Sequence, residues 1–83
     1  MILYLVVPCY NEQEVLEVTA EKLNEKLNAL CSKNIISSLS RIVFVDDGSK
    51  DETWNIINRL HDKNKIFSGI KLSRNRGHQN ALL

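Results

Sequence analysis

The chain has 83 residues, which is enough for one small domain. Hydrophobic residues make up 43% of the sequence and charged residues 25%, and the net charge of +1 gives no indication of electrostatic capture of nucleic acid or of an anionic membrane surface. No apolar run approaches the roughly 20 residues of a membrane-spanning helix, and the N-terminus lacks the features of a signal peptide, so we expect this chain to be soluble. Cys9 and Cys31 lack metal-ligand spacing, which favours reduced thiols in a cytosolic domain.

Apolar patterns along the chain predict alternating strands and helices. Residues 2–7 and 41–45 are continuous apolar runs typical of strands that are covered on both faces, and residues 66–72 form a weaker third run. Between these runs, apolar residues recur at helical spacing; they are Leu16, Ala20, Leu23, Leu27 and Leu30 in the first segment, and Thr53, Ile56, Ile57 and Leu60 in the second. This order predicts an α/β fold with a Rossmann-like parallel sheet and right-handed crossovers.

The boundaries of the helices also carry signals. Asn11 with Glu14, and Ser49 with Glu52, have the three-residue spacing at which the first side chain caps a helix N-terminus. Residues 75–83 are expected to form a loop that enters a third helix near His78. A three-stranded sheet with one helix incomplete leaves an exposed edge and an uncovered face, so we expect residues 1–83 to be the N-terminal part of a longer protein.

Three polar segments should meet at the carboxyl edge of the sheet, where parallel sheets bind ligands: residues 8–12, 46–49 and 73–77. Asp46 and Asp47 there are candidate metal ligands, proton acceptors or acceptors for the N–H and hydroxyl groups of a ligand; the alternative is that one or both only stabilise the turn. Side chains alternate along a strand, so the two carboxylates should point in different directions, with Val45 and Asp47 on one side. Asp46 is then expected to contribute to stability or to the geometry of the turn.

Taken singly, the other residues at this edge also have structural explanations. Pro8 is expected to end the first strand because it cannot donate to the ladder, and Glu12 complements a helix dipole. The sequence contains no G-x-G-x-x-G, G-x-x-x-x-G-K-[ST] or G-x-S-x-G motif, which argues against dinucleotide-binding, P-loop and hydrolase sites. A phosphoacceptor receiver domain would need its paired aspartates after the first strand, whereas here they follow the second.

Three motifs in order, VVPCYNEQEVL, IVFVDDGSKDETWNII and LSRNRGHQNALL, resemble the opening of family 2 glycosyltransferases with the GT-A fold. The similarity is greatest to the group of dolichol-phosphate mannosyltransferases and bactoprenol-phosphate glucosyltransferases. It covers almost the whole chain and is weakest over residues 31–40. The resemblance implies that a nucleoside diphosphate sugar binds at the carboxyl edge, with its nucleotide held by Pro8, Tyr10, Glu12, Val45 and Asp47. It also implies that residues 74–78 approach the same pocket.

The resemblance further implies an enzyme that transfers a hexose to a polyprenyl phosphate, associated with the cytoplasmic side of a membrane, in lipid-linked sugar or cell-wall synthesis. Its divalent cation, Mg²⁺ or Mn²⁺, would be held mainly by an Asp-x-Asp motif that this sequence lacks. We therefore assign no catalytic residue and no metal ligand, and expect residues 1–83 alone to be inactive and to self-associate. The alternative is a stand-alone nucleotide-binding or interaction module without catalysis.

Overall fold

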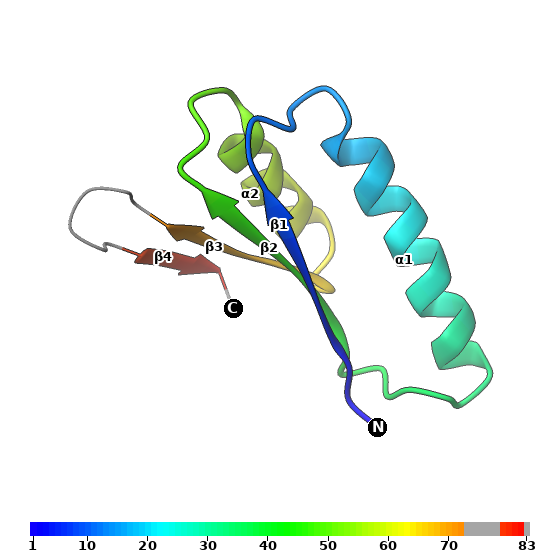
Figure 1. The fold of residues 1–83 in the computed structure, drawn as a ribbon. Helices are drawn as coiled ribbons and strands as arrows, with labels where there is room; N and C mark the ends of the chain where they lie inside the picture. Colours follow the sequence, from blue (N-terminus) through cyan, green and yellow to red (C-terminus); the bar gives the residue numbers. More distant parts are fainter. Residues whose placement is uncertain (73–78, 83) are drawn as a thin grey trace.

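The computed structural model describes the backbone of residues 1–72 and 79–82, and the side chains of residues 1–72. Its elements, in chain order, are β1 (Tyr4–Cys9), α1 (Leu16–Ser32), β2 (Arg41–Asp47), α2 (Thr53–Lys63), β3 (Phe67–Leu72) and β4 (Gln79–Leu82). They form one sheet of order β1-β2-β3-β4, in which the first three strands are parallel and β4 is antiparallel to β3 (Figure 1). The predicted Rossmann-like α/β class is confirmed.

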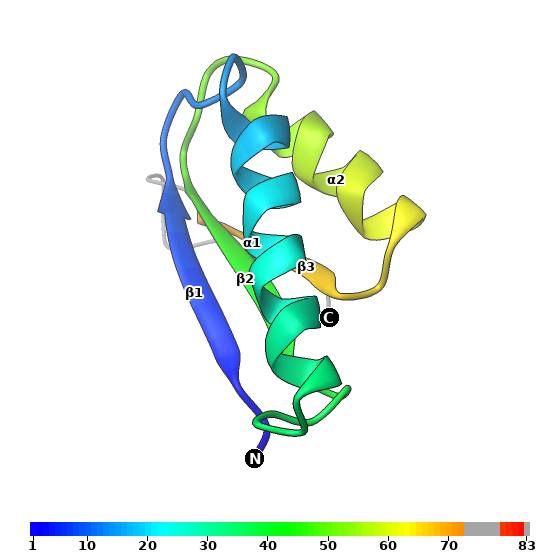
Figure 2. The same cartoon turned by 90° about the vertical axis from the view of Figure 1, so that its right-hand side faces the viewer.

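Both helices lie on the same face of the sheet (Figure 2), and the core fills the space between the two layers. Ile42 and Phe44 of β2 are fully buried there, as are Ala20 of α1 and Ile57 of α2. These residues are the apolar stripes that the strand and helix periods place toward each other. The helix spacing read from the sequence therefore identifies the faces that pack.

The opposite face of the sheet carries apolar side chains that none of the described helices covers. Tyr4 and Val6 of β1 are 64% and 60% exposed, whereas Leu5 and Val7, which alternate with them, pack against the core. In the parallel register Val6 pairs with Val43 of the next strand, where Val43 is buried and Val45 is half-buried, so the strongly exposed part of this face lies on β1. Parallel sheets are usually covered on both faces, which makes this open face a prominent feature of the fold.

Two boundary predictions are wrong. Residues 79–82 form β4 instead of belonging to a third helix, and their antiparallel pairing satisfies backbone groups along the edge of β3 that would otherwise lack partners. The predicted helix start at His78 lies outside the described residues. Pro8 does not end the first strand, because β1 continues to Cys9. β1 pairs only with β2 in the described sheet, and an edge strand tolerates a missing N–H donor.

Candidate functional site

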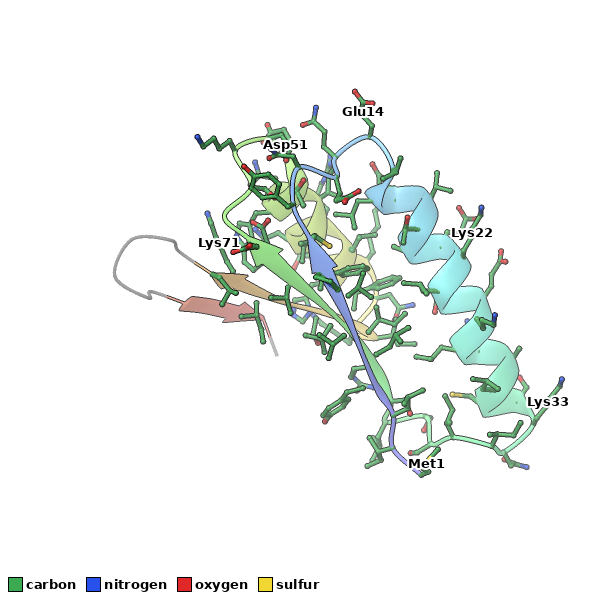
Figure 3. The ribbon with its side chains drawn as sticks, viewed as in Figure 1. Met1, Glu14, Lys22, Lys33, Asp51 and Lys71 are labelled. Carbon is green, nitrogen blue, oxygen red and sulfur yellow. The ribbon has the colours of Figure 1, made fainter. Side chains whose placement is uncertain are left out.

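The site lies at the carboxyl ends of β1 and β2, where two loops follow the strands. The first loop covers residues 10–15 and the second covers residues 48–52. Figure 3 shows Glu14 of the first loop and Asp51 of the second at the same end of the molecule, opposite Met1 and Lys33. The predicted convergence of the segments after the first two strands is therefore confirmed.

The predicted helix caps are wrong. α1 begins at Leu16 and α2 at Thr53, and their N-cap residues, Val15 and Glu52, make no side-chain capping bond. The side chains of Asn11 and Ser49 point instead to the neighbouring loop. A polar side chain in a loop can satisfy an amide of another segment, and the amides that donate to Asn11 and Ser49 lie 39 and 38 residues away.

The two loops are joined by hydrogen bonds between the backbone amides of one and the side chains of the other. The Asn11 amide donates to Ser49 Oγ over 2.8 Å, and the Lys50 amide donates to Asn11 Oδ1 over 2.9 Å. The Glu12 amide donates to Thr53 Oγ1 over 2.8 Å. Two more bonds run from the Gln13 amide to Asp51 Oδ2 and from the Glu52 amide to Gln13 Oε1, over 3.3 and 2.9 Å. We call this set of residues, 11–13 with 49–53, the loop clamp.

Thr53 is a buried junction of the clamp. Its hydroxyl accepts from the Glu12 amide and donates to Asp51 Oδ1, so both of its hydrogen-bonding functions are used. The Thr53 amide also donates to Asp51 Oδ1, over 2.9 Å. Desolvation opposes ionisation of Asp51, but the hydrogen bonds from Thr53 and Gln13 outweigh it and hold the pKa of this carboxyl below its usual value.

Two backbone conformations allow these loops to turn. Asn11 has a φ of 50° and Gly48 a φ of 74°, both in the left-handed region. Glycine enters this region without steric cost, and asparagine is among the few other residues that tolerate it. Gly48 directly follows Asp47 and therefore sets the direction in which the chain leaves β2.

The two adjacent aspartates have different environments, as the strand alternation predicted. Asp46 is fully buried on the helix side of the sheet, where its Oδ1 accepts from the Ser49 amide over 3.2 Å. Its Oδ2 is buried and, within the described part of the chain, makes no hydrogen bond. Asp47 is exposed. Only Asp47 is therefore accessible to a ligand from solvent.

The structure brings most of the predicted nucleotide-binding residues to one face. Pro8 and Val45 are register partners in the β1–β2 ladder, and Asp47 lies two residues beyond Val45 on the same side. Tyr10 follows the end of β1 and is 43% exposed. Glu12 lies beyond the end of β1, where it lines a cavity of about 160 Å³ together with Leu16 of α1, and Pro8 of the row borders the same cavity.

Glu12 and the buried aspartate influence Cys9. The Cys9 thiol is 3% exposed, and desolvation, reinforced by the charges of Glu12 and Asp46, raises its pKa to about 11. A thiol that stays protonated at neutral pH is a poor nucleophile and a poor metal ligand. Cys9 is therefore a structural residue of the strand end.

The described residues do not fit the divalent cation that the resemblance implies. Nowhere in residues 1–72 do three or more His, Cys, Asp or Glu side chains gather in a way that would hold a metal ion. Asp46 and Asp47, the pair that suggested a cation site, diverge to opposite sides of the strand. Neither α1 nor α2, the helices of the described residues, combines the length and the hydrophobicity of a membrane-spanning segment.

The sequence reasoning missed the loop clamp. The polar residues that follow the first two strands were visible in the sequence. Their hydrogen-bond partners could not be identified, because those partners are distant in sequence. The predicted contribution of residues 74–78 lies outside the described residues.

Comparison with known proteins gives consistent matches. A family model for glycosyl transferase family 2 matches residues 4–83. The uncharacterized glycosyltransferase YkoT of Bacillus subtilis (strain 168) is 48% identical over 82 residues, which cover 99% of this chain and 24% of that protein. The prophage bactoprenol glucosyl transferase homolog of Escherichia coli (strain K12) is 35% identical over 78 residues, 94% of this chain and 24% of its own length.

The name of a third relative specifies a modified arabinose and undecaprenyl phosphate. The undecaprenyl-phosphate 4-deoxy-4-formamido-L-arabinose transferase of Pectobacterium atrosepticum is 35% identical over 80 residues, which cover 95% of this chain and 23% of that protein. This chain therefore spans about a quarter of the length of each of these relatives.

Proposed function

The chain belongs to glycosyltransferase family 2, and we propose that the carboxyl edge of its sheet binds the nucleoside diphosphate part of a sugar donor. The observation that carries this proposal is the row formed by Pro8, Val45 and Asp47 on one face of adjacent strands. Ligands of open parallel sheets bind outside the carboxyl ends of the strands, which is where this row ends.

The chemistry of these side chains suits a nucleoside. The exposed ring of Tyr10 offers an aromatic face on which a planar base can stack, and Pro8 and Val45 supply apolar contact beside it. The Asp47 carboxylate is an acceptor for the N–H groups of the base, and a hydrogen bond to a charged acceptor is stronger than a neutral one. Glu12, from the other side of the strand end, is the residue we assign to the ribose hydroxyls.

The names of the relatives extend the proposal to the acceptor. Two of them are named for bactoprenol and for undecaprenyl phosphate. We propose that the protein transfers a hexose from its donor to a polyprenyl phosphate at the cytoplasmic face of a membrane. A Mg²⁺ or Mn²⁺ ion supplies neutralising charge to a leaving diphosphate when it is bound. The described residues do not provide the ligands of this ion. We therefore propose that the ligands correspond to the part of the relatives that this chain does not match.

The donor site can be tested by titrating UDP and GDP calorimetrically into the full-length protein and its Asp47→Ala variant. A hydrogen bond to a charged acceptor contributes about 1.5–3 kcal/mol, so the variant should bind the preferred nucleotide about tenfold more weakly, or worse. Asp62→Ala is the matched control, because it removes an exposed carboxylate near the far end of α2. Equal affinity in the wild type and the Asp47 variant would remove the central residue of the proposed pocket.

A further inference from the structure

We propose that Asn11 and Thr53 are positioning residues, which hold the two loops in the one relative placement that forms the nucleotide pocket. This inference rests on the proposed donor site. It concerns two residues that need not contact the nucleotide and that act through the loop clamp.

Asn11 connects the loops in both directions. Its amide donates to Ser49 Oγ and its side-chain Oδ1 accepts from the Lys50 amide, over 2.8 and 2.9 Å. Asn11 lies between Tyr10 and Glu12 in the sequence, and Ser49 is two residues beyond Asp47. A shift of the Asn11 contact would therefore change the separation between the residues proposed to hold the two sides of the nucleotide.

The backbone of Asn11 explains why this residue type suits the position. At a φ of 50° most side chains are strained, whereas asparagine is tolerated and also supplies the acceptor for Lys50. Glycine would tolerate the same φ but has no acceptor, and aspartate would keep both properties. Comparing asparagine, glycine and aspartate at position 11 therefore distinguishes the need for a left-handed backbone from the need for the hydrogen bond to the Lys50 amide.

Thr53 performs the corresponding task for Glu12. Its buried hydroxyl is the acceptor of the Glu12 amide, and it is oriented by its own donation to Asp51. Valine has the same shape as threonine without the hydroxyl, so Thr53→Val would leave the Glu12 amide without this acceptor in a half-buried position. Thr53→Ser keeps the hydroxyl and restores the bond.

The clamp bonds join the two loops beyond the point where the β1–β2 ladder ends at Cys9 and Asp46. Both loops are irregular segments, and all five cross-loop bonds that we describe depend on residues 11–13 and 49–53. Binding sites need their side chains within roughly 0.5 Å of the productive arrangement, and supporting hydrogen bonds supply that precision. Loss of one clamp bond should therefore weaken nucleotide binding even though no residue of the pocket is changed.

The test uses the full-length protein and calorimetric titration with UDP and GDP, at a temperature where circular dichroism shows each variant to be folded. Asn11→Gly should raise the dissociation constant of the preferred nucleotide about fivefold to tenfold, and Asn11→Asp should restore most of the affinity. Asn34→Gly is the matched control, because Asn34 also has a left-handed backbone, with a φ of 59°, and it follows α1 at the opposite end of the sheet. Its affinity should be unchanged.

A second pair of variants avoids any change of backbone preference or charge. Thr53→Val should weaken binding by a similar factor and Thr53→Ser should recover it, which decides the question if Asn11→Gly does not fold. Amide hydrogen exchange adds a direct readout, since the Lys50 amide should lose protection in Asn11→Gly and keep it in Asn34→Gly.

The outcomes separate the two proposals. If the wild type binds neither UDP nor GDP, the proposed donor site is wrong and the positioning role falls with it. If the wild type binds and both Asn11→Gly and Thr53→Val bind equally well, the donor site stands and the positioning role is wrong. Equal weakening by Asn11→Gly and Asn34→Gly would also overturn it, because the effect would then follow general stability.

Discussion

Replacing Gly69 with alanine should destabilise the fold, because α2 lies directly against the backbone of β3 at this position. A Cβ atom on Gly69 would lie 2.5 Å from Ile57 Cγ2 and 3.2 Å from Trp54 Cζ3. Carbon atoms in contact are usually about 3.5–4.0 Å apart, so the new methyl group would overlap Ile57 by about 1 Å. Ile57 is fully buried and β-branched in a helix, where its χ1 angle is restricted, so it cannot simply rotate away.

Two opposing terms set the magnitude. Overpacking a core position costs about 1–3 kcal/mol. Alanine also restricts the unfolded chain, which stabilises the fold by about 0.4–1 kcal/mol where the native backbone suits it, and the φ of Gly69 is not positive. The net expectation is a loss of about 1–2 kcal/mol in the free energy of unfolding.

The assay is urea unfolding of residues 1–83 followed by circular dichroism at matched protein concentrations. With a slope of about 1–2 kcal/mol per M for a chain of this size, the midpoint should fall by about 1 M. Ile57→Ala alone should cost about 2–5 kcal/mol, and the double variant should cost less than the sum because the new methyl group fills part of the space. A midpoint for Gly69→Ala at or above that of the wild type, or strict additivity in the double variant, would refute the steric argument.

Two further predictions concern association and thiol chemistry. Because the open sheet face exposes Tyr4 and Val6, residues 1–83 should associate as concentration rises in sedimentation velocity, and a compact monomer that unfolds cooperatively at every concentration would contradict this. In a Cys31→Ser variant, Cys9 should react with iodoacetamide about a hundredfold more slowly at pH 8 than an ordinary thiol, because its pKa is raised to about 11; an ordinary rate would contradict the buried environment. The raised pKa also means that the contribution of Cys9 to stability is present below pH 9.0 and is lost as the pH rises toward 11, because the unfolded thiol ionises first.

Local patterns in the sequence determined the order of the first five elements and the faces on which they pack. The apolar spacing of Leu16, Ala20 and Leu27 marked the buried side of α1, and the alternation along β2 separated the buried Asp46 from the exposed Asp47. These predictions succeeded because they depend on the periods of a strand and a helix, which are properties of the chain within a few residues. The predicted parallel sheet located the candidate site at the carboxyl ends of its strands, and the family motifs added the ligand and the residues expected to hold it.

Tertiary structure decided the partners of polar groups and the pairing of the last strand. Asn11 and Ser49 have the sequence pattern of helix caps, yet their hydrogen-bond partners lie 38 and 39 residues away, because the two strand ends bring these loops together. Residues 79–82 pair as β4 because the edge of β3 offers them backbone partners. A hydrogen-bonding group takes whichever partner the folded chain brings within reach, and that choice depends on contacts that no local pattern contains.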